Sequence, residues 1–277
     1  MVSNLLEADV EAALDAAFVD GDDELLIVDP AAETAVSLIE AAADRDDLPT
    51  LSVLADERTL KTVTDEFLVA STAADLVAAG ALDFRVLGGA VDNALFVSPS
   101  RVVALVTVDD GVAALSTDDP EFVDEVSAAH RATFDEAEPY VLRTPEISRV
   151  RETMAAEIGA ATRDDFDAVL ASMETDRADG SGPELDEVTV SLLVAARNDV
   201  LLYDISKWGE DVGIASKATF SRTKTRLEDA GIIDTEKVPI DVGRPRLRLK
   251  LGDERLRAVD ADELAAVATD LLAARPA

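Results

Sequence analysis

The residues best suited to chemistry in this sequence are the basic side chains between positions 214 and 250. Nine lysine and arginine residues stand there against five acids, a local net charge of +4 in a chain whose formal net charge is -33 at pH 7. Such side chains neutralise phosphate groups, which the acidic surface elsewhere would repel. We therefore predict that this stretch contacts double-stranded DNA. The predicted DNA-binding residues are Ser216, Lys217, Thr219, Ser221, Arg222, Lys224, Arg226, Lys237, Arg244, Arg246 and Arg248.

The basic residues divide into expected phosphate contacts and expected base contacts. The phosphate contacts are Lys217, Arg244 and Lys250. Contacts of this kind set the register of a protein on the duplex but carry no sequence information. Arg222 is the first choice for a base contact, because arginine is the usual partner of guanine O6 and N7. Thr219 or Ser221 is expected at a thymine methyl group or a phosphate.

Apolar spacing around the basic stretch predicts three helices. They cover residues 185–197, 204–208 (or 204–212) and 216–230. Ser216 is a favourable N-cap for the third helix. In that helix Phe220 and Leu227 lie seven residues apart and are expected to face the core. The face expected to meet DNA carries Thr219, Arg222 and Arg226. The third helix therefore has the pattern of a recognition helix.

A basic hairpin is expected after the third helix. Residues 232–233 begin a strand, and a turn at 241–244 precedes the alternating strand 246–251, whose leucines face inward and whose basic residues face outward. Two helices, a basic helix and a basic hairpin form the order of a winged helix-turn-helix. In such a domain the recognition helix enters the major groove and the wing, here 238–250, touches the DNA backbone.

The first half of the chain alternates helical patterns with short apolar runs. The expected helices are 4–18, 31–43, 57–79 and 120–138, and the expected strands are 25–28, 51–54, 84–87, 94–97, 101–108 and 112–115. Alternating elements followed by consecutive strands are typical of an α/β domain with two or three layers. The predicted fold class is an α/β N-terminal domain plus a C-terminal α+β winged helix-turn-helix domain.

Three segments are expected along the chain. They are an α/β effector or regulatory domain at 1–140, a helical linker and dimerisation segment at 141–180, and the winged helix-turn-helix domain at 181–277. The linker is expected to hold helices at 146–161 and 163–173. The boundary is placed in the loop 176–183, which contains two glycines, a serine and a proline. A last helix over 260–275 is expected either in a dimer interface or in the core of one subunit.

Composition narrows the class of protein. Dispersed acidity in a chain poor in lysine and aromatic residues favours a protein from an extreme halophile, where molar salt screens the carboxylates. The chain has no cysteine and one histidine, which excludes disulfides, thiolate zinc sites and multi-histidine metal sites. No catalytic residue, metal or cofactor is predicted. The apolar runs are too short to span a bilayer and the N-terminus lacks a secretion signal, so a cytoplasmic location without membrane contact is expected.

Three features of the N-terminal half are candidates for ligand contacts. Asp29 follows the first apolar run, at the end of a strand where α/β domains place ligand-binding groups, but the Asp29-Pro30 pair is also a helix-start signal, which is the interpretation we favour. Gly88 and Gly89 could bring backbone amides to a ligand, although such a pair is more often a turn. His130, on an expected acidic helix, is predicted to be a surface or partly packed residue.

Residues 201–251 also resemble a known family. The resemblance lies in the Ser-x-x-Thr-Phe-Ser-Arg segment from Ser216, the following Leu-Glu-x-Ala-Gly-Ile-Ile, the region of Trp208 and the Val-Gly-Arg-Pro-Arg sequence of the wing. Together they resemble the haloarchaeal TrmB-suppressor regulators, the TbsP family. The resemblance implies a homodimeric regulator of metabolic genes, above all central carbon genes, with the N-terminal domain as effector or regulatory domain.

The sequence is compatible with two classes of function. In the first, the protein is a DNA-binding transcriptional regulator whose N-terminal domain senses a small-molecule metabolite. In the second, the N-terminal domain docks a protein partner or processes a metabolite, and the winged helix serves partner contacts, with Arg246 and Arg248 on a solvated strand face. The absence of a glycine-rich phosphate loop or a histidine cluster favours a protein that is not an enzyme.

Overall fold

In the computed structural model the chain forms two compact units, Met1–Glu146 and Ile147–Ala277. The structure describes residues 4–7, 23–43, 45, 49–89, 91–108, 111–178, 185–240 and 245–274. Within those ranges, no helix combines the length and the apolar character needed to cross a membrane.

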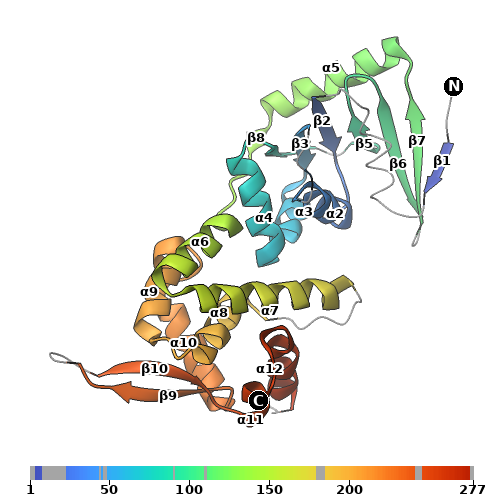
Figure 1. The fold of residues 1–277 in the computed structure, drawn as a ribbon. Helices are drawn as coiled ribbons and strands as arrows, with labels where there is room; N and C mark the ends of the chain where they lie inside the picture. The colour runs from blue at the N-terminus through green and yellow to red at the C-terminus, as the bar shows by residue number, and fades with distance from the viewer. Residues whose placement is uncertain are drawn as a thin grey trace. The chain divides into compact units, whose positions relative to one another are not determined.

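The first unit is built on a mixed sheet (Figure 1). In the described residues its strands follow the order β1-β7-β6-β5-β2-β3-β4-β8. The strands are β1 (Asn4–Glu7), β2 (Glu24–Val28), β3 (Thr50–Ala55), β4 (Leu82–Val86), β5 (Ala94–Val97), β6 (Val102–Val108), β7 (Gly111–Thr117) and β8 (Glu138–Pro139). Strands β2, β3 and β4 are parallel, whereas β5 is antiparallel to both β2 and β6. The parallel and antiparallel parts of the sheet therefore meet at β2.

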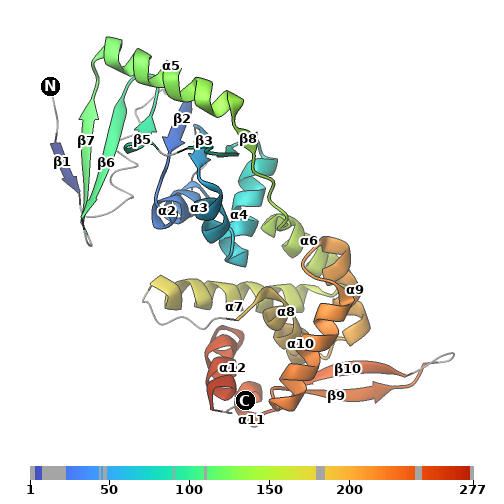
Figure 2. The same cartoon turned by 180° about the vertical axis from the view of Figure 1, so that it is seen from behind.

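Helices cover both faces of this sheet, as Figures 1 and 2 show. They are α2 (Ala32–Ala43), α3 (Glu57–Val63), α4 (Phe67–Ala78) and α5 (Pro120–Glu136). Since successive strand residues point to opposite faces, β2 contributes to two cores. Leu25 and Ile27 belong to the core that includes residues of α2, α3 and α4. Leu26 and Val28 belong to the core closed by α5. The predicted α/β fold of this half is confirmed as a three-layer arrangement.

One expected element of the first unit is wrong. Residues 4–7, predicted as the start of a helix, form β1 and pair antiparallel with β7. Helical spacing is a local signal, and here backbone hydrogen bonding to a strand more than a hundred residues away overrides it. The remainder of that predicted helix, 8–18, lies outside the described residues.

The second unit is helical apart from one strand pair. Its elements are α6 (Ile147–Glu157), α7 (Ala160–Ala178), α8 (Glu187–Arg197), α9 (Leu202–Val212), α10 (Lys217–Asp229), β9 (Ile233–Val238), β10 (Arg246–Leu251), α11 (Glu254–Ala258), the 3-10 turn η1 (Ala261–Glu263) and α12 (Leu264–Ala273). Helices, a strand pair and their order agree with the predicted winged helix-turn-helix. Helix α11 had no counterpart among the expected elements.

The helices expected to form a linker are part of the second unit. Val150 and Met154 of α6 and Phe166 and Val169 of α7 are fully buried. Helix α6 packs against α9, and α7 packs against α8 and η1. The boundary between the units consequently lies at Glu146, because burial of these apolar faces ties both helices to the winged helix. The loop expected to mark the boundary starts after α7, and residues 179–184 lie outside the described part.

The C-terminal helix packs within its own chain. Leu264, Ala265, Ala268 and Leu271 are buried, and α12 contacts α7 and α11. This packing agrees with the expected role in the core of one subunit. The segment begins with the 3-10 turn η1 and becomes α-helical at Leu264.

Candidate nucleic-acid interface

The helix-turn-helix consists of α9, a tight turn and α10, and two glycines shape it. A Cβ atom on Gly209 would stand 2.3 Å from the ring of Phe220, so only glycine lets α9 and α10 pack this closely. Gly213 ends α9 with φ at +98°, a left-handed conformation that glycine adopts without strain. The Gly209 carbonyl accepts a backbone hydrogen bond from Ile214 at 2.8 Å. These contacts set the angle at which α10 leaves the turn.

Helix α10 buries one side and presents the other to solvent. The Ser216 hydroxyl caps the helix by accepting a hydrogen bond from the backbone N–H of Thr219 at 3.2 Å. Phe220 and Leu227 are fully buried, which confirms the prediction from their spacing. The exposed side carries Ala218, Ser221, Arg222 and Thr225. Three of these side chains are small, so the helix backbone can approach a groove closely while Arg222 reaches toward base edges.

The wing is a hairpin with a third, very short strand beside it. Strands β9 and β10 pair antiparallel in a register that places Arg246 opposite Val238 and Leu251 opposite Ile233. Leu201, which precedes α9, forms a bridge with Arg248, and the backbone N–H of Leu249 donates to the Val200 carbonyl at 2.9 Å. The wing is therefore held to the segment that leads into the helix-turn-helix. Arg244 and the rest of the predicted turn 241–244 lie outside the described residues.

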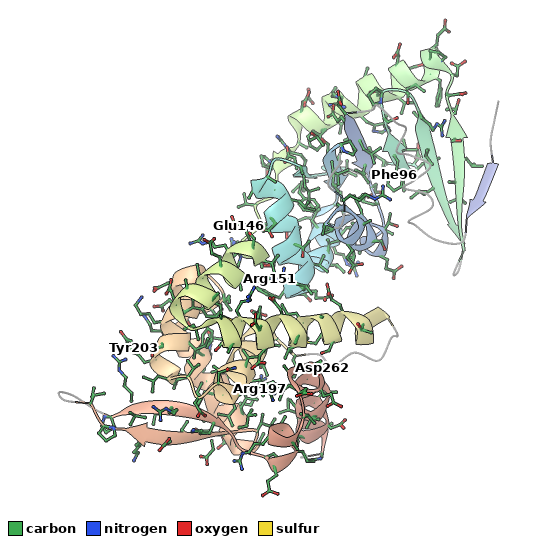
Figure 3. All side chains as sticks on the ribbon, viewed as in Figure 1. Phe96, Glu146, Arg151, Arg197, Tyr203 and Asp262 are labelled. Atoms are coloured by element: carbon green, nitrogen blue, oxygen red, sulfur yellow. The ribbon has the colours of Figure 1, made fainter. Side chains whose placement is uncertain are left out.

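Arg246 lies at the junction between the wing and α9. Its guanidinium carbon stands 4.3 Å from the centroid of the Tyr203 ring, a cation–π arrangement, and its Nη1 lies 3.4 Å from the Asp204 carboxylate. Figure 3 labels Tyr203 on α9, and its side chain is 48% exposed. The stacked ring holds the guanidinium in one orientation at the surface, where it remains accessible.

Most of the predicted DNA-binding cations have an acidic partner within the second unit. The ion pairs are Lys217–Glu210 (2.5 Å), Lys224–Glu228 (2.5 Å), Arg226–Asp186 (3.5 Å), Arg246–Asp204 (3.4 Å), Arg248–Glu236 (3.7 Å) and Lys250–Asp199 (2.7 Å). Ion pairs at the surface contribute little to stability, so a phosphate can replace the acid at small cost. The local positive charge is smaller than the sequence count indicates.

Lys224 differs from the other cations in its burial. Its side chain is 11% exposed and donates to Glu228, whose other carboxylate oxygen accepts a hydrogen bond from the Thr235 hydroxyl at 2.7 Å. These contacts connect α10 with β9. The structure thus gives Lys224 a role in joining the recognition helix to the wing, although the sequence pattern placed it among the DNA contacts.

Arg222 and Lys237 are the predicted cations without an acidic partner in the described residues. Both are exposed. The Arg222 Nη2 donates to the Thr219 hydroxyl at 3.3 Å, a contact along the same face of α10 that leaves the guanidinium charge uncompensated. Lys237 lies on β9, opposite Leu247 of β10. These two cations can meet DNA without first releasing a carboxylate.

The Lys217–Glu210 pair joins the start of α10 to α9. The hydrogen bond between the side chains raises the pKa of Lys217 and lowers the pKa of Glu210. Glu210 also accepts the backbone N–H of Lys217 at 3.3 Å. Both groups are therefore charged at neutral pH, and a DNA phosphate approaching Lys217 would have to compete with Glu210.

Three residues of this surface were not among the sequence predictions. Tyr203 preceded the predicted start of the second helix, so its place beside Arg246 was not recognised. Ala218 and Thr225 lie four residues before and three residues after Arg222 respectively, on its face of α10. That spacing alone could have identified both as neighbours of the candidate base contact.

The N-terminal candidates have mixed outcomes. Gly88 and Gly89 have nothing within 4 Å of an added Cβ, so neither requires a close backbone approach. His130 on α5 is half-buried, and burial lowers its pKa. The described residues hold no group of three or more histidine or carboxylate side chains placed to bind a metal ion. Asp29 lines a cavity of the first unit.

Two family models match the chain. Residues 2–145 match the model described as transcriptional regulator TbsP-like, N-terminal, and residues 146–269 match the model described as transcriptional regulator TbsP-like, C-terminal HTH domain. The junction between the two matches coincides with the boundary between the two compact units. No curated protein matches the chain.

Solved structures resemble only part of the chain. One is TrmBL2, described as an archaeal chromatin protein with a novel mode of DNA binding, with 18% identity, a TM-score of 0.38 and coverage of 50% of this chain and 54% of that chain. Another is Nuc from Salmonella typhimurium, a phospholipase D family member, with 9% identity, a TM-score of 0.35 and coverage of 50% and 96%. The chain thus spans about half the length of TrmBL2, and neither likeness is close enough to carry an argument.

Proposed function

The chain belongs to the TbsP-like family of transcriptional regulators, and from this we propose that α10 enters the DNA major groove while the wing contacts the backbone. The observation that carries the proposal is Arg222. It is exposed beside the small side chains of Ala218, Ser221 and Thr225 on α10, and in the described residues it forms no ion pair with an acid. Arg222 is proposed to read guanine, with Ser221 or Thr219 beside it.

The paired cations are proposed to hold the phosphates on either side of the groove. Side chains that are 37–57% exposed, namely Lys217, Arg226, Arg246, Arg248 and Lys250, can exchange a carboxylate for a phosphate. Each exchange leaves a carboxylate near the DNA, which weakens binding at low ionic strength. High salt screens that repulsion, since the Debye length falls to about 3 Å at 1 M. This charge arrangement supports the proposal that the protein works in the cytoplasm of a halophilic archaeon.

The wider proposal follows the family. The protein is proposed to regulate metabolic genes, central carbon genes among them, as a homodimer whose two recognition helices address two half-sites. The N-terminal unit is proposed to change the affinity for the operator when it binds a metabolite. No enzymatic step is part of this proposal.

The first experiment maps DNA bound in cells by crosslinking and sequencing, at the native salt concentration. Wild-type protein is compared with Arg222→Ala and with the control Arg149→Ala, which removes the same charge from an exposed position on α6. Discrete promoter peaks that Arg222→Ala loses and Arg149→Ala keeps are the expected result. Equal peaks for all three proteins would remove Arg222 from base recognition, and no enrichment under several carbon sources would refute the DNA-binding function.

A docking function is the second candidate, and the ion pairs favour it. A wing whose basic side chains are already paired with acids matches a solvated strand face that serves protein contacts. The same experiment separates the two candidates, because a docking domain gives no sequence motif under its crosslinked peaks. Fluorescence anisotropy with the enriched sequence and a scrambled duplex then measures the specificity directly.

A further inference from the structure

The first unit contains a cavity of about 320 Å³ beside β2. The volume lies at the lower end of the range of small-molecule sites, which run from about 300 to 1,000 Å³. Its polar lining comes from Asp29, Thr34, Thr59, Asp92 and Asn93. Because these residues belong to three separate stretches of the chain, 29–34, 59 and 92–93, only the fold brings them together.

The topology of the sheet explains why these residues meet. Strand β2 pairs parallel with β3 on one side and antiparallel with β5 on the other, with Val28 opposite Leu95. The end of β2 and the start of β5 therefore lie at the same edge of the sheet, which places Asp29 near Asn93. In α/β sheets, the crevice outside the carboxyl ends of the strands is where ligands bind.

Asp29 has an unusual backbone and environment. Its φ is +50°, in the left-handed region, and its N–H donates to the Leu54 carbonyl at 2.8 Å, which holds the bend. Burial, and second the negative charge of Asp56, raise the pKa of its carboxyl group. Helix α2 begins at Ala32, as the helix-start interpretation predicts, but the Asp29 carboxylate has no hydrogen-bond partner in the described residues and does not cap the helix.

Thr34 adds a second polar group to the lining. Its side chain lines the cavity from α2, and the residue is only 7% exposed. Its hydroxyl makes no hydrogen bond to any described residue and is not among the fully buried side-chain atoms that lack a partner, so it is open to the cavity. Thr59 differs, because its hydroxyl donates to Asp56 at 2.7 Å and therefore presents its lone pairs as acceptors.

The lining defines the class of ligand. It contains two carboxylates, two threonine hydroxyls and one amide, and none of its residues is basic. Such a lining offers acceptors and repels anions, so phosphorylated or carboxylated ligands do not fit. The apolar side chains of Val91 and Leu105, with Pro30, provide room for a short methylene chain.

We propose that this cavity binds a small primary amine in its ammonium form, with the Asp29 carboxylate as counter-ion and the Thr34 hydroxyl as a second acceptor. This inference rests on one part of the proposed function, namely that the N-terminal unit responds to a metabolite. It adds the site and the chemical class of the ligand. Binding itself requires neither DNA nor the winged helix.

The experiment is isothermal titration of the full-length protein with putrescine, without DNA and at high salt. The variants are Asp29→Asn, which keeps the size and tolerates a left-handed φ, and Thr34→Val, which removes only the hydroxyl. Asp65→Asn, an exposed acid of the same unit, is the control for general attraction to an acidic protein. We expect one site per chain, about tenfold weaker binding for Asp29→Asn, a smaller loss for Thr34→Val and no change for the control.

Three outcomes would overturn the proposal. They are no binding of putrescine, binding that Asp29→Asn leaves unchanged, and binding of glucose in place of putrescine, which would assign the site to hydroxyl donors. Anisotropy with operator DNA, measured on the same preparations, keeps this result apart from the proposed function. A protein that binds DNA but not putrescine loses only the cavity proposal, whereas the reverse result loses only the DNA-binding proposal.

Discussion

The surface of the second unit that we propose to bind DNA and the cavity of the first unit differ in whether their polar and charged groups have partners. On the surface, most cations already have a carboxylate partner. In the cavity, Asp29 and Thr34 have no hydrogen-bond partner in the described residues. An exposed pair can exchange its acid for a phosphate at small cost, while the Asp29 carboxylate, whose pKa is raised by burial, has no basic partner in the described residues. The surface suits reversible binding to a polyanion, and the cavity suits one small ligand.

The variant with the largest expected effect should disrupt the DNA-binding surface and leave the cavity intact. Gly209→Val places a side chain where a Cβ atom would already stand 2.3 Å from Phe220, so α9 and α10 must move apart. We expect a loss of about 2–3 kcal/mol in the free energy of unfolding, measured by denaturant titration, and loss of DNA binding. Putrescine binding should persist. The control Gly88→Ala has open space around the new methyl group and should unfold like the wild type; equal stability of the two variants would contradict the packing argument.

The stacking of Arg246 on Tyr203 gives the next effect. Tyr203→Leu removes the ring but keeps the arginine, and a cation–π contact of this exposed kind contributes about 0.5–1 kcal/mol. We expect DNA affinity to fall by roughly threefold on all sequences, by anisotropy. The slope of log K against log salt should stay constant for Tyr203→Leu, whereas Arg246→Ala should reduce it by about one unit. A changed slope for Tyr203→Leu would mean that the ring does more than orient the guanidinium.

A smaller effect tests whether the ion pairs are exchangeable. Glu210→Gln releases Lys217 from its acidic partner and removes a negative charge from the neighbourhood of the DNA. We expect binding to become about two- to threefold tighter at moderate salt, since one charge that repels the phosphates is removed, and the gain should vanish at molar salt. Glu66→Gln, on the first unit, serves as the matched control. Weaker binding by Glu210→Gln would show that Glu210 positions Lys217 for DNA.

The smallest effect concerns Asp29 and pH. The pKa of the Asp29 carboxyl group is raised in the folded state. At pH values between the unfolded and the folded pKa, the folded protein therefore binds more protons than the unfolded chain. As a result, lowering the pH through this range increases the free energy of unfolding. At neutral pH the charged carboxylate therefore opposes folding. We expect Asp29→Asn to raise the melting temperature at pH 7 by about 1–3 °C. For the wild type, putrescine affinity should fall as the pH drops through the raised pKa; a pH-independent affinity would contradict the role of the carboxylate.

Local patterns in the sequence determined the elements of the winged helix. Phe220 and Leu227 are seven residues apart, and a helix brings both to one side, so their burial followed from spacing. Ser216 caps α10 because a hydroxyl before a helical run accepts from the first turn. The alternating strand of the wing is equally local, since its inward leucines and outward cations reflect a period of two.

The tertiary structure decided what those residues contact. Residues 4–7 became a strand because β7 offered backbone partners. Lys224 was drawn to Glu228 and away from solvent, and Arg246 was stacked on Tyr203, through contacts that no local period encodes. Asp29 and Asn93 share a cavity because antiparallel pairing brings the start of β5 beside the end of β2. Spacing along the chain determines which face a side chain occupies, but only the packed fold determines its neighbours, and those neighbours set its charge balance and its availability to a ligand.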